Sequence, residues 1–153
     1  TDINDTHIEQ NVGISKDFNN FELCNAVAMQ DVARAMKIAD HFAHNPKDNP
    51  LLVTVMALYS QFRDMFIINY LRWLAQYKGI PFPNEMELMR TLKKNNIYAV
   101  KELSQQSLRW PNRKVFNILG LLREYDGKSK GIDAGGMNDG ELLRELLLKI
   151  FMQ

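Results

Sequence analysis

Few residues in this 153-residue chain have the types and spacing that chemistry requires. His41 and His44 lie three residues apart, with Asp40 and Asp48 close by, and could offer metal ligands from one helix face. No third and fourth ligand follows at short range. We therefore prefer the interpretation that these histidines lie at a solvated helix end, where a histidine interacts favourably with the helix dipole. The single cysteine, Cys24, has no neighbouring base to activate it, and we expect a packed apolar side chain.

A glycine-rich run from Gly131 to Gly136 precedes a helix, where backbone amides could hold a phosphate. It lacks a preceding strand and the Gly-Lys-Ser/Thr ending of a nucleotide loop, and Asp133 and Asp139 would repel an anion. We therefore expect a mobile connector. Four glutamates have no spacing that favours paired acid/base chemistry, and they are expected on solvated faces: Glu85, Glu87, Glu102 and Glu124. The sequence predicts no catalytic residue, no cofactor and no bound metal.

The composition is that of one ordinary globular domain, with 46% hydrophobic and 24% charged residues. A chain of this length can bury about 70% of its unfolded surface without a disulfide or metal. The formal charge of +1 excludes a global field that would attract nucleic acid or membrane. A lone cysteine fits a reducing compartment, so a cytoplasmic location is expected.

Two features concern processing and membranes. The chain starts at Thr1 with no initiator Met and no apolar leader, so we expect a processed chain or, in preference, a piece excised from a longer protein. Residues 51–74 form the only candidate membrane span, but Arg63 and Asp64 would be costly in hydrocarbon. A water-soluble helix, with no membrane partner, is therefore predicted.

Apolar residues recur at helical spacing almost throughout, and neither an alternating strand nor a fixed repeat is evident. The expected helices are 6–12, one from Asn19 or Asn20, one from Asp31 to Asn45, 49–77 with Asn49 as its cap, 84–93, 98–108, 111–126, and a last one capped by Asp139. The predicted class is all-α, a single compact bundle of about seven helices.

The faces of these helices are also predicted. In the long helix the residues expected to face the core are Leu52, Val55, Met56, Tyr59, Phe62, Phe66, Tyr70 and Trp73, with Leu58, Met65 and Ile68 widening that ridge. Phe21, Leu23, Cys24, Ala26 and Val27 are expected inward in the second helix, and Val32, Ala35, Met36, Ala39 and Phe42 in the third. The penultimate helix is expected to bury Val115, Ile118, Leu119, Leu122 and Tyr125, and the last one Leu142, Leu143, Leu146, Leu147, Ile150 and Phe151.

Basic residues concentrate in the second half of the chain. Residues 1–76 have a net charge of −3 and residues 77–153 a net charge of +4. Ten basic residues face three acids between Arg90 and Lys130, with aromatic residues interleaved. Such a surface could meet an acidic protein partner, which is preferred, or a phosphate backbone. The candidate DNA-facing residues are Lys93, Lys94, Arg109, Arg113 and Lys114.

Several segments together resemble a known family. They are GISKDFNNFEL at 13–23, Asp31-Val32, NPKDNP at 45–50, LLREYDGKSKG at 121–131 and DGELL at 139–143. In combination they look like the C-terminal end of the bacterial DNA polymerase III delta subunit, most of all the versions in Bacteroidetes. The matches bracket essentially the whole chain, whereas residues 77–113 match poorly.

The resemblance implies a clamp-loader component without an active site of its own, whose parent belongs to a DNA-directed DNA polymerase holoenzyme. In that family two N-terminal ATPase-like domains open the sliding clamp, and a helical domain joins gamma/tau and delta-prime type subunits in a pentameric collar. Residues 1–18 would be the tail of the preceding domain and 19–153 the collar domain. The sliding clamp would be contacted by the N-terminal domains, which are missing from this chain, and primed DNA would be reached only indirectly.

The resemblance and the excess of apolar surface on the long and last helices suggest a protein interface. Its candidate residues are Arg123, Tyr125, Asp126, Lys130, Leu142 and Leu146. Tyr125, Asp126, Lys128 and Lys130 could make interdomain ion pairs or merely end a helix, and the sequence does not separate these roles. A helical nucleic-acid-binding domain is the alternative function. An all-α enzyme or small-ligand binder is a third.

Overall fold

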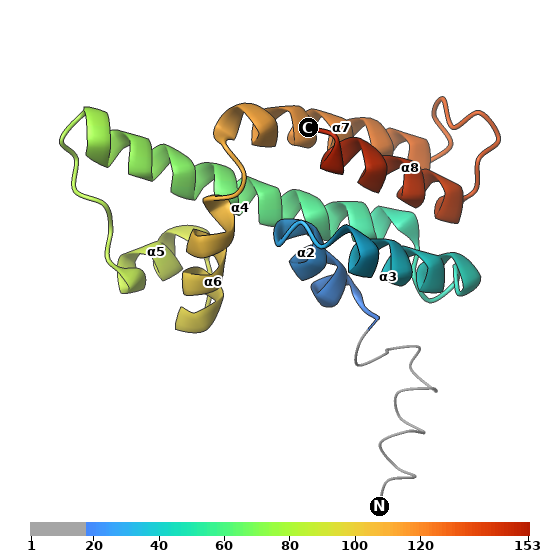
Figure 1. Ribbon diagram of the computed structural model, residues 1–153, viewed down its shortest axis with the longest axis horizontal. Helices are drawn as coiled ribbons and strands as arrows, with labels where there is room; N and C mark the ends of the chain where they lie inside the picture. The colour runs from blue at the N-terminus through green and yellow to red at the C-terminus, as the bar shows by residue number, and fades with distance from the viewer. Residues whose placement is uncertain (1–17) are drawn as a thin grey trace, which may run out of the picture.

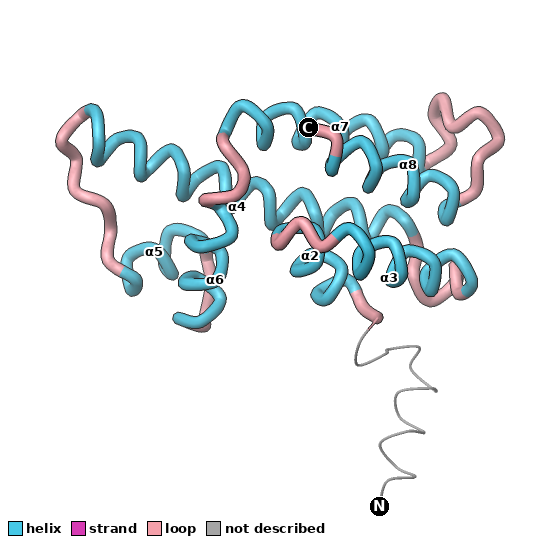
Figure 2. Tube along the Cα trace, in the orientation of Figure 1, coloured by secondary structure: helices cyan, strands magenta, loops and turns pink. Residues whose placement is uncertain are grey.

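The computed structural model describes residues 18–153, which form seven helices and no strand (Figures 1 and 2). The helices are α2 (Asn20–Ala28), α3 (Val32–His44), α4 (Leu51–Tyr77), α5 (Glu85–Leu92), α6 (Ile97–Ser107), α7 (Asn112–Ser129) and α8 (Asp139–Phe151). The all-α class and the order of these elements are therefore confirmed. The helix expected at 6–12 lies outside the described residues.

Helix α4 runs through the middle of the molecule and packs against α2, α6, α7 and α8 (Figure 1). Helices α3 and α8 pack on each other, as do α2 and α3. The short helices α5 and α6 pack together and reach the bundle mainly through contacts of α6 with α4. The end of α4 that carries Tyr77 extends past the start of α7 (Figure 1).

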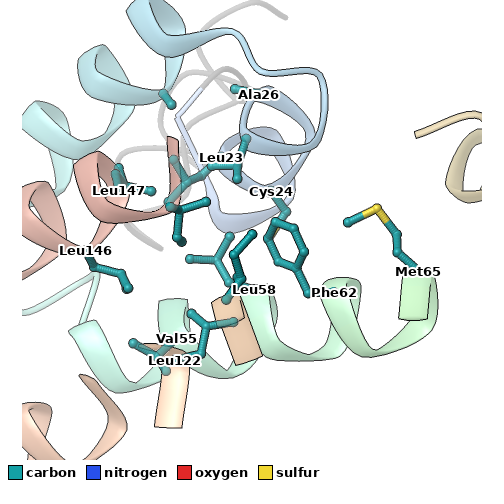
Figure 3. Packing of buried hydrophobic residues seen from close by; sticks show 14 of the residues in the cluster. Leu23, Cys24, Ala26, Val55, Leu58, Phe62, Met65, Leu122, Leu146 and Leu147 are labelled. Carbon is teal, nitrogen blue, oxygen red and sulfur yellow. The ribbon is translucent and has the colours of Figure 1, made fainter. Parts of the chain in front are cut away.

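The core is one cluster of apolar side chains from every helix. Figure 3 shows residues of α2, α4, α7 and α8 converging, among them Leu23, Leu58, Phe62, Leu122 and Leu146. The buried apolar face of α4 consists of Leu51, Val55, Leu58, Phe62, Met65 and Ile68, which recur every three or four residues. The predicted inward faces of α7 and α8 are confirmed, except that Leu119 and Phe151 are only half-buried.

The predicted inward face of α4 is wrong in half of its members. Met56, Tyr59, Tyr70 and Trp73 are exposed, while Leu58, Met65 and Ile68, expected at the margin, are at the centre of the buried face. Two apolar stripes wind along this helix, and both have helical spacing. Phe21 and Val32, expected inward on α2 and α3, are also exposed.

Most helix boundaries follow local capping signals. The side chains of Asn19, Asp31 and Asn84 accept hydrogen bonds from the first turns of α2, α3 and α5. Two expected caps differ. Helix α4 begins after Pro50 rather than at Asn49, and α8 is capped by Asn138, which forms a capping box with Glu141.

Helix α7 is longer than expected, ending at Ser129 rather than near Asp126. Gly127 lies inside the helix, and Gly131, with φ of +91°, is the residue that turns the chain away. The N–H of Ile132 then donates to the carbonyl of Gly127 at 3.0 Å, which satisfies a terminal carbonyl of the helix. The residue that stops the helix is therefore Gly131, four residues after Gly127.

Within the described residues, α4 is the one helix long and apolar enough to cross a membrane. Its apolar window is 44% buried inside the bundle, and it carries the buried carboxylate of Asp64. Both properties are typical of the central helix of a water-soluble bundle.

Candidate protein-interaction surface

Three of the six predicted interface residues lie inside the domain. Tyr125, Leu142 and Leu146 are at most 1% exposed and pack in the core of this chain. The apolar stripe of α8 is covered by α3, α4 and α7, so it leaves little surface for a partner. A contact role for these three residues is wrong for the folded domain.

The other three predicted interface residues are accessible from solvent. Arg123 is exposed on α7, and Asp126 and Lys130 form an ion pair of 3.1 Å at the end of that helix. Arg123 and Asp126 also line an open groove of about 380 Å³ between α4 and α7. We call it the α4–α7 groove, and its lining residues are Val55, Met56, Tyr59, Ser60, Arg63, Leu122, Arg123 and Asp126.

The segment 121–131 at the end of α7 is tied to α8 through the ring and hydroxyl of Tyr125. The hydroxyl donates to Glu145, and the ammonium groups of Lys128 and Lys149 lie 4.9 and 5.2 Å from the centroid of the ring. Lys128 also lies 3.3 Å from Glu124. Within the described part of the chain, this cluster joins α7 to α8.

The same cluster shifts two pKa values. Burial, followed by the hydrogen bond to Glu145, raises the pKa of the Tyr125 hydroxyl far above its ordinary value. The hydrogen bond from Tyr125 is the largest cause that lowers the pKa of Glu145, and the two lysines contribute. A neutral tyrosine and an ionised glutamate are therefore the stable pair at neutral pH.

A second surface feature lies on α4 itself. Met56, Tyr59, Tyr70, Trp73 and Tyr77 are 36% to 64% exposed and follow one another along one side of the helix. The rings of Tyr70 and Trp73 stack with centroids 6.1 Å apart, and those of Trp73 and Tyr77 lie 5.9 Å apart. We call these five residues the α4 stripe. The sequence pattern had revealed most of them but had placed them in the core.

The five predicted DNA-facing residues fall into two groups. Lys94 is half-buried and its ammonium lies 3.0 Å from the buried carboxylate of Asp64, while Lys93 ends α5 in a left-handed conformation with φ of 56°. Arg109, Arg113 and Lys114 surround the turn between α6 and α7 and have no ion pair with an acid of the described residues.

This basic turn is fixed against the middle of α4. The side-chain amide of Asn69 donates to the carbonyl of Trp110 at 2.8 Å and to the side chain of Asn112 at 3.0 Å. Asn112 in turn donates to the carbonyl of Phe66 at 3.2 Å. Because Tyr70 and Trp73 follow Asn69 on α4, the basic turn is held close to the aromatic half of the α4 stripe.

An open groove of about 400 Å³ lies between α2, α4 and α6. Gln106 crosses it, donating to Asn25 at 2.7 Å and accepting from Gln61 at 3.1 Å. The Asp64–Lys94 ion pair lines the same groove. Since these polar groups mainly bind one another, the groove is best described as the polar junction that holds α5 and α6 on the bundle.

The residues considered for chemistry have other contacts. His41 stacks on Phe18 with centroids 4.9 Å apart, and Nδ1 of His44 lies 2.8 Å from the carbonyl oxygen of Asp40. Burial raises the pKa of the Cys24 thiol to about 12, which keeps it protonated at neutral pH. Over residues 18–153, no three His, Cys, Asp or Glu side chains are placed to hold a metal.

The glycine-rich connector between α7 and α8 consists of tight turns. Gly131, Gly135 and Gly136 have positive φ, and so does Asp133, with φ of 53°. No strand leads into it over the described chain. Comparison of the chain with protein-family models, with curated proteins and with solved structures gave no match.

Proposed function

We propose that this chain is a non-catalytic assembly domain, of the helical collar type that the clamp-loader delta resemblance implies. In this role it acts in the cytoplasm and holds together a pentamer with gamma/tau and delta-prime type subunits. ATP-driven opening of the sliding clamp takes place elsewhere in the assembly, on primed DNA. The observation that carries the proposal is the α4–α7 groove, where Arg123 and Asp126 meet exposed apolar residues of α4.

The composition of this groove supports a protein partner. Met56 is 60% exposed, and the tyrosine ring of Tyr59 lies beside it. Arg63, Arg123 and Asp126 surround these apolar groups with both signs of charge. Met, Tyr and Arg are enriched in the centres of protein interfaces, where an apolar core is enclosed by a polar rim.

The rest of the described chain also supports binding rather than catalysis. The titratable side chains with shifted pKa values, Cys24, Arg72, Tyr125 and Glu145, lie in the core or in contacts between helices. Arg72, for example, donates to the carbonyl of Ser104 and the hydroxyl of Ser107, and so links α4 to α6. These contacts build the rigid body that a collar subunit needs.

The test is co-purification of the chain with the gamma/tau and delta-prime type subunits. Arg123→Glu and Met56→Asp should each weaken the association at least tenfold, because they place a repulsive or solvated charge in the groove. Arg90→Glu, an exposed arginine on α5, is the matched control and should leave association unchanged. Thermal melts show that each variant folds. Failure of the wild-type chain to join these subunits at any salt concentration contradicts the proposal.

A second candidate function is binding of nucleic acid by the basic turn. It is favoured by Arg109, Arg113 and Lys114, which lie close together on the turn without carboxylate partners in the described chain. Fluorescence anisotropy with primed DNA should then show affinity that falls steeply between 50 and 200 mM salt, on the order of tenfold or more for each few phosphate contacts. Arg113→Ala with Lys114→Ala should reduce that salt dependence. Affinity that does not change with salt excludes this candidate.

A further inference from the structure

The α4 stripe has the spacing of a helix-docking seam. Its members fall at positions 56, 59, 70, 73 and 77, and Arg63 and Phe66 fill the intervening positions, so the steps alternate between three and four. This 3.5-residue repeat keeps one face of a helix toward a partner helix. Over 22 residues it extends for about 32 Å at 1.5 Å per residue. The exposed apolar members therefore lie towards the two ends of this seam, and Arg63 and the half-buried Phe66 occupy its middle.

The exposed side chains of the stripe fit a dry protein contact. The ring of Tyr70 stacks on Trp73, and Trp73 makes a tilted ring contact with Tyr77, so these rings are partly ordered before any partner binds. Fully buried aromatic side chains cover about 150–250 Å² each and dominate the energetics of interfaces. Ile67 and Leu74, both half-buried, extend the apolar surface along the same side of the helix. The apolar surface is continuous from Ile67 to Tyr77, and its course along α4 suits a partner helix.

The positive charge around the α4 stripe favours a negatively charged partner. Two segments near the stripe include no Asp or Glu: residues 65–84 and residues 103–123. Together they contain the second half of α4, the basic turn and most of α7. The outward-facing cations of these two segments are Lys78, Arg109, Arg113, Lys114 and Arg123. The ammonium of Lys78 lies 5.6 Å from the centroid of the Trp73 ring, at the end of the stripe. Carboxylates beside an apolar seam would complement this rim.

A second copy of the chain fits less well. Parallel pairing of two stripes would place Arg63 opposite Arg63. Antiparallel pairing would centre on Phe66, and α7 begins beside that residue, so the two basic turns would face each other across the symmetry axis. Both orientations oppose like charges, which destabilises the pair.

We infer that the α4 stripe binds an amphipathic helix of another chain, with apolar residues at 3.5-residue spacing and carboxylates along its flanks. This inference rests on the proposed assembly function and adds the chemistry of the partner. The rings of Tyr70, Trp73 and Tyr77 form the apolar centre of the contact. Lys78, Arg113 and Lys114 pair with the flanking carboxylates.

The test uses two synthetic three-heptad peptides with Leu at a and d, one with Glu at e and g and the other with Lys there. The acidic peptide should bind the 153-residue chain at least tenfold more tightly than the basic peptide, and it should shift the emission of the exposed Trp73 to the blue. Tyr77→Ala should weaken binding at least tenfold. Arg113→Glu with Lys114→Glu should reverse the preference between the peptides.

Tyr98→Ala is the matched control, because Tyr98 is an exposed aromatic on α6 with Lys101 5.9 Å from its ring centroid, much as Lys78 lies beside Trp73. It should not change peptide binding. Equal affinity for the two peptides, or loss of binding in Tyr98→Ala, overturns the inference. So does tighter binding of a 12-nucleotide thymidine strand than of the acidic peptide, or a dimer of the chain alone in sedimentation that Tyr77→Ala dissociates.

The two proposals can fail separately. If Arg123→Glu prevents co-purification with the loader subunits and Tyr77→Ala does not, the assembly function stands and the inferred role of the stripe is wrong. If the chain joins no loader subunit but binds the acidic peptide through Tyr77, the stripe is a helix-docking site and the clamp-loader assignment is wrong.

Discussion

Asp139, the first residue of α8, caps the start of α4, 88 residues earlier in the chain. Its carboxylate oxygen accepts the N–H of Leu51 at 2.9 Å. Helix α4 begins after Pro50 and has no side-chain cap of its own, so a free N–H in its first turn is satisfied by another helix. The negative charge also lies at the positive end of the dipole of α4.

Replacement of this carboxylate should therefore destabilise the whole bundle. Asp139→Ala removes both the hydrogen bond and the charge, and we expect the free energy of unfolding in urea to fall by about 1–2 kcal/mol. Asp133→Asn is the control, because it removes an exposed carboxylate from the neighbouring connector and asparagine tolerates the left-handed φ of 53° there; it should change stability by less than about 0.5 kcal/mol. Equal effects at the two positions would show that the cap contributes nothing.

The crossing of α3 and α8 depends on the absence of a side chain at Gly140. A Cβ atom there would lie 2.6 Å from Cβ and 3.1 Å from Cα of Ala43. Gly140→Ala should thus push the two helices apart and cost about 1–3 kcal/mol of unfolding free energy. Gly120, in α7, has nothing within 4 Å of the same position. Gly120→Ala should stabilise the protein by about 0.5–1 kcal/mol, and a loss at Gly120 would contradict this account.

Most helix boundaries could be predicted from the sequence, because capping signals are local. The buried face could also be predicted for a helix that carries a single apolar stripe. Asn19, Asp31 and Asn84 cap helices that begin within one residue of them, and α8 has one wide leucine face. The cap of α4 could not be predicted, since Asp139 reaches it only after the chain has folded. Local capping signals therefore favour Asn49 as the cap of α4 instead.

The buried side of α4 required tertiary information. Val55, Leu58 and Phe62 on one stripe and Tyr59, Tyr70 and Trp73 on the other have equivalent spacing, and which is covered depends on where α2 and α7 pack. Because of this ambiguity, the sequence pattern predicts four members of the α4 stripe, Met56, Tyr59, Tyr70 and Trp73, to face the core. The same limit made Leu142 and Leu146 interface candidates as well as core residues, because the area that neighbouring helices cover cannot be counted from one helix at a time.

The ion pair between Asp64 and Lys94 anchors the α5–α6 pair on α4. Asp64 is 1% exposed, and the ammonium of Lys94 lies 3.0 Å from its Oδ2, while Arg63 lies 3.4 Å from Oδ1. Lys94→Met leaves a buried carboxylate with only the partly solvated Arg63 as its partner. We expect a loss of about 2 kcal/mol of unfolding free energy.

Replacing both partners tests whether the loss comes from the stranded charge. Asp64→Leu combined with Lys94→Met removes the carboxylate as well, so the double variant should recover at least half of the stability that Lys94→Met loses. Lys93→Met, next in sequence but exposed, should have little effect. A double variant less stable than Lys94→Met alone would show that the pair itself, and not its disruption, is what matters.

The hydrogen bond from Tyr125 to Glu145 should give stability a pH dependence at both ends of the scale. The pKa of Tyr125 is raised in the folded state, so the stabilising effect is complete below the unfolded value of about 10 and declines as pH rises above it. The pKa of Glu145 is lowered, so its contribution is present above its ordinary value and declines as pH falls through the folded one. At neutral pH both contributions are complete.

Tyr125→Phe keeps the buried ring close to Lys128 and Lys149 and removes only the hydroxyl. At pH 7 we expect it to lower the free energy of unfolding measurably, because a hydrogen bond to an ionised carboxylate is lost. The difference from the wild-type protein should shrink above pH 10, because the unfolded wild-type tyrosine ionises there while the folded one stays neutral. It should shrink again as pH falls below the ordinary pKa of a glutamate and through the lowered pKa of Glu145 in the folded state. Since both lysines remain in the variant, their titration cancels in the comparison, and a difference that stayed constant from pH 3 to pH 11 would show that the hydroxyl and the carboxylate are not coupled.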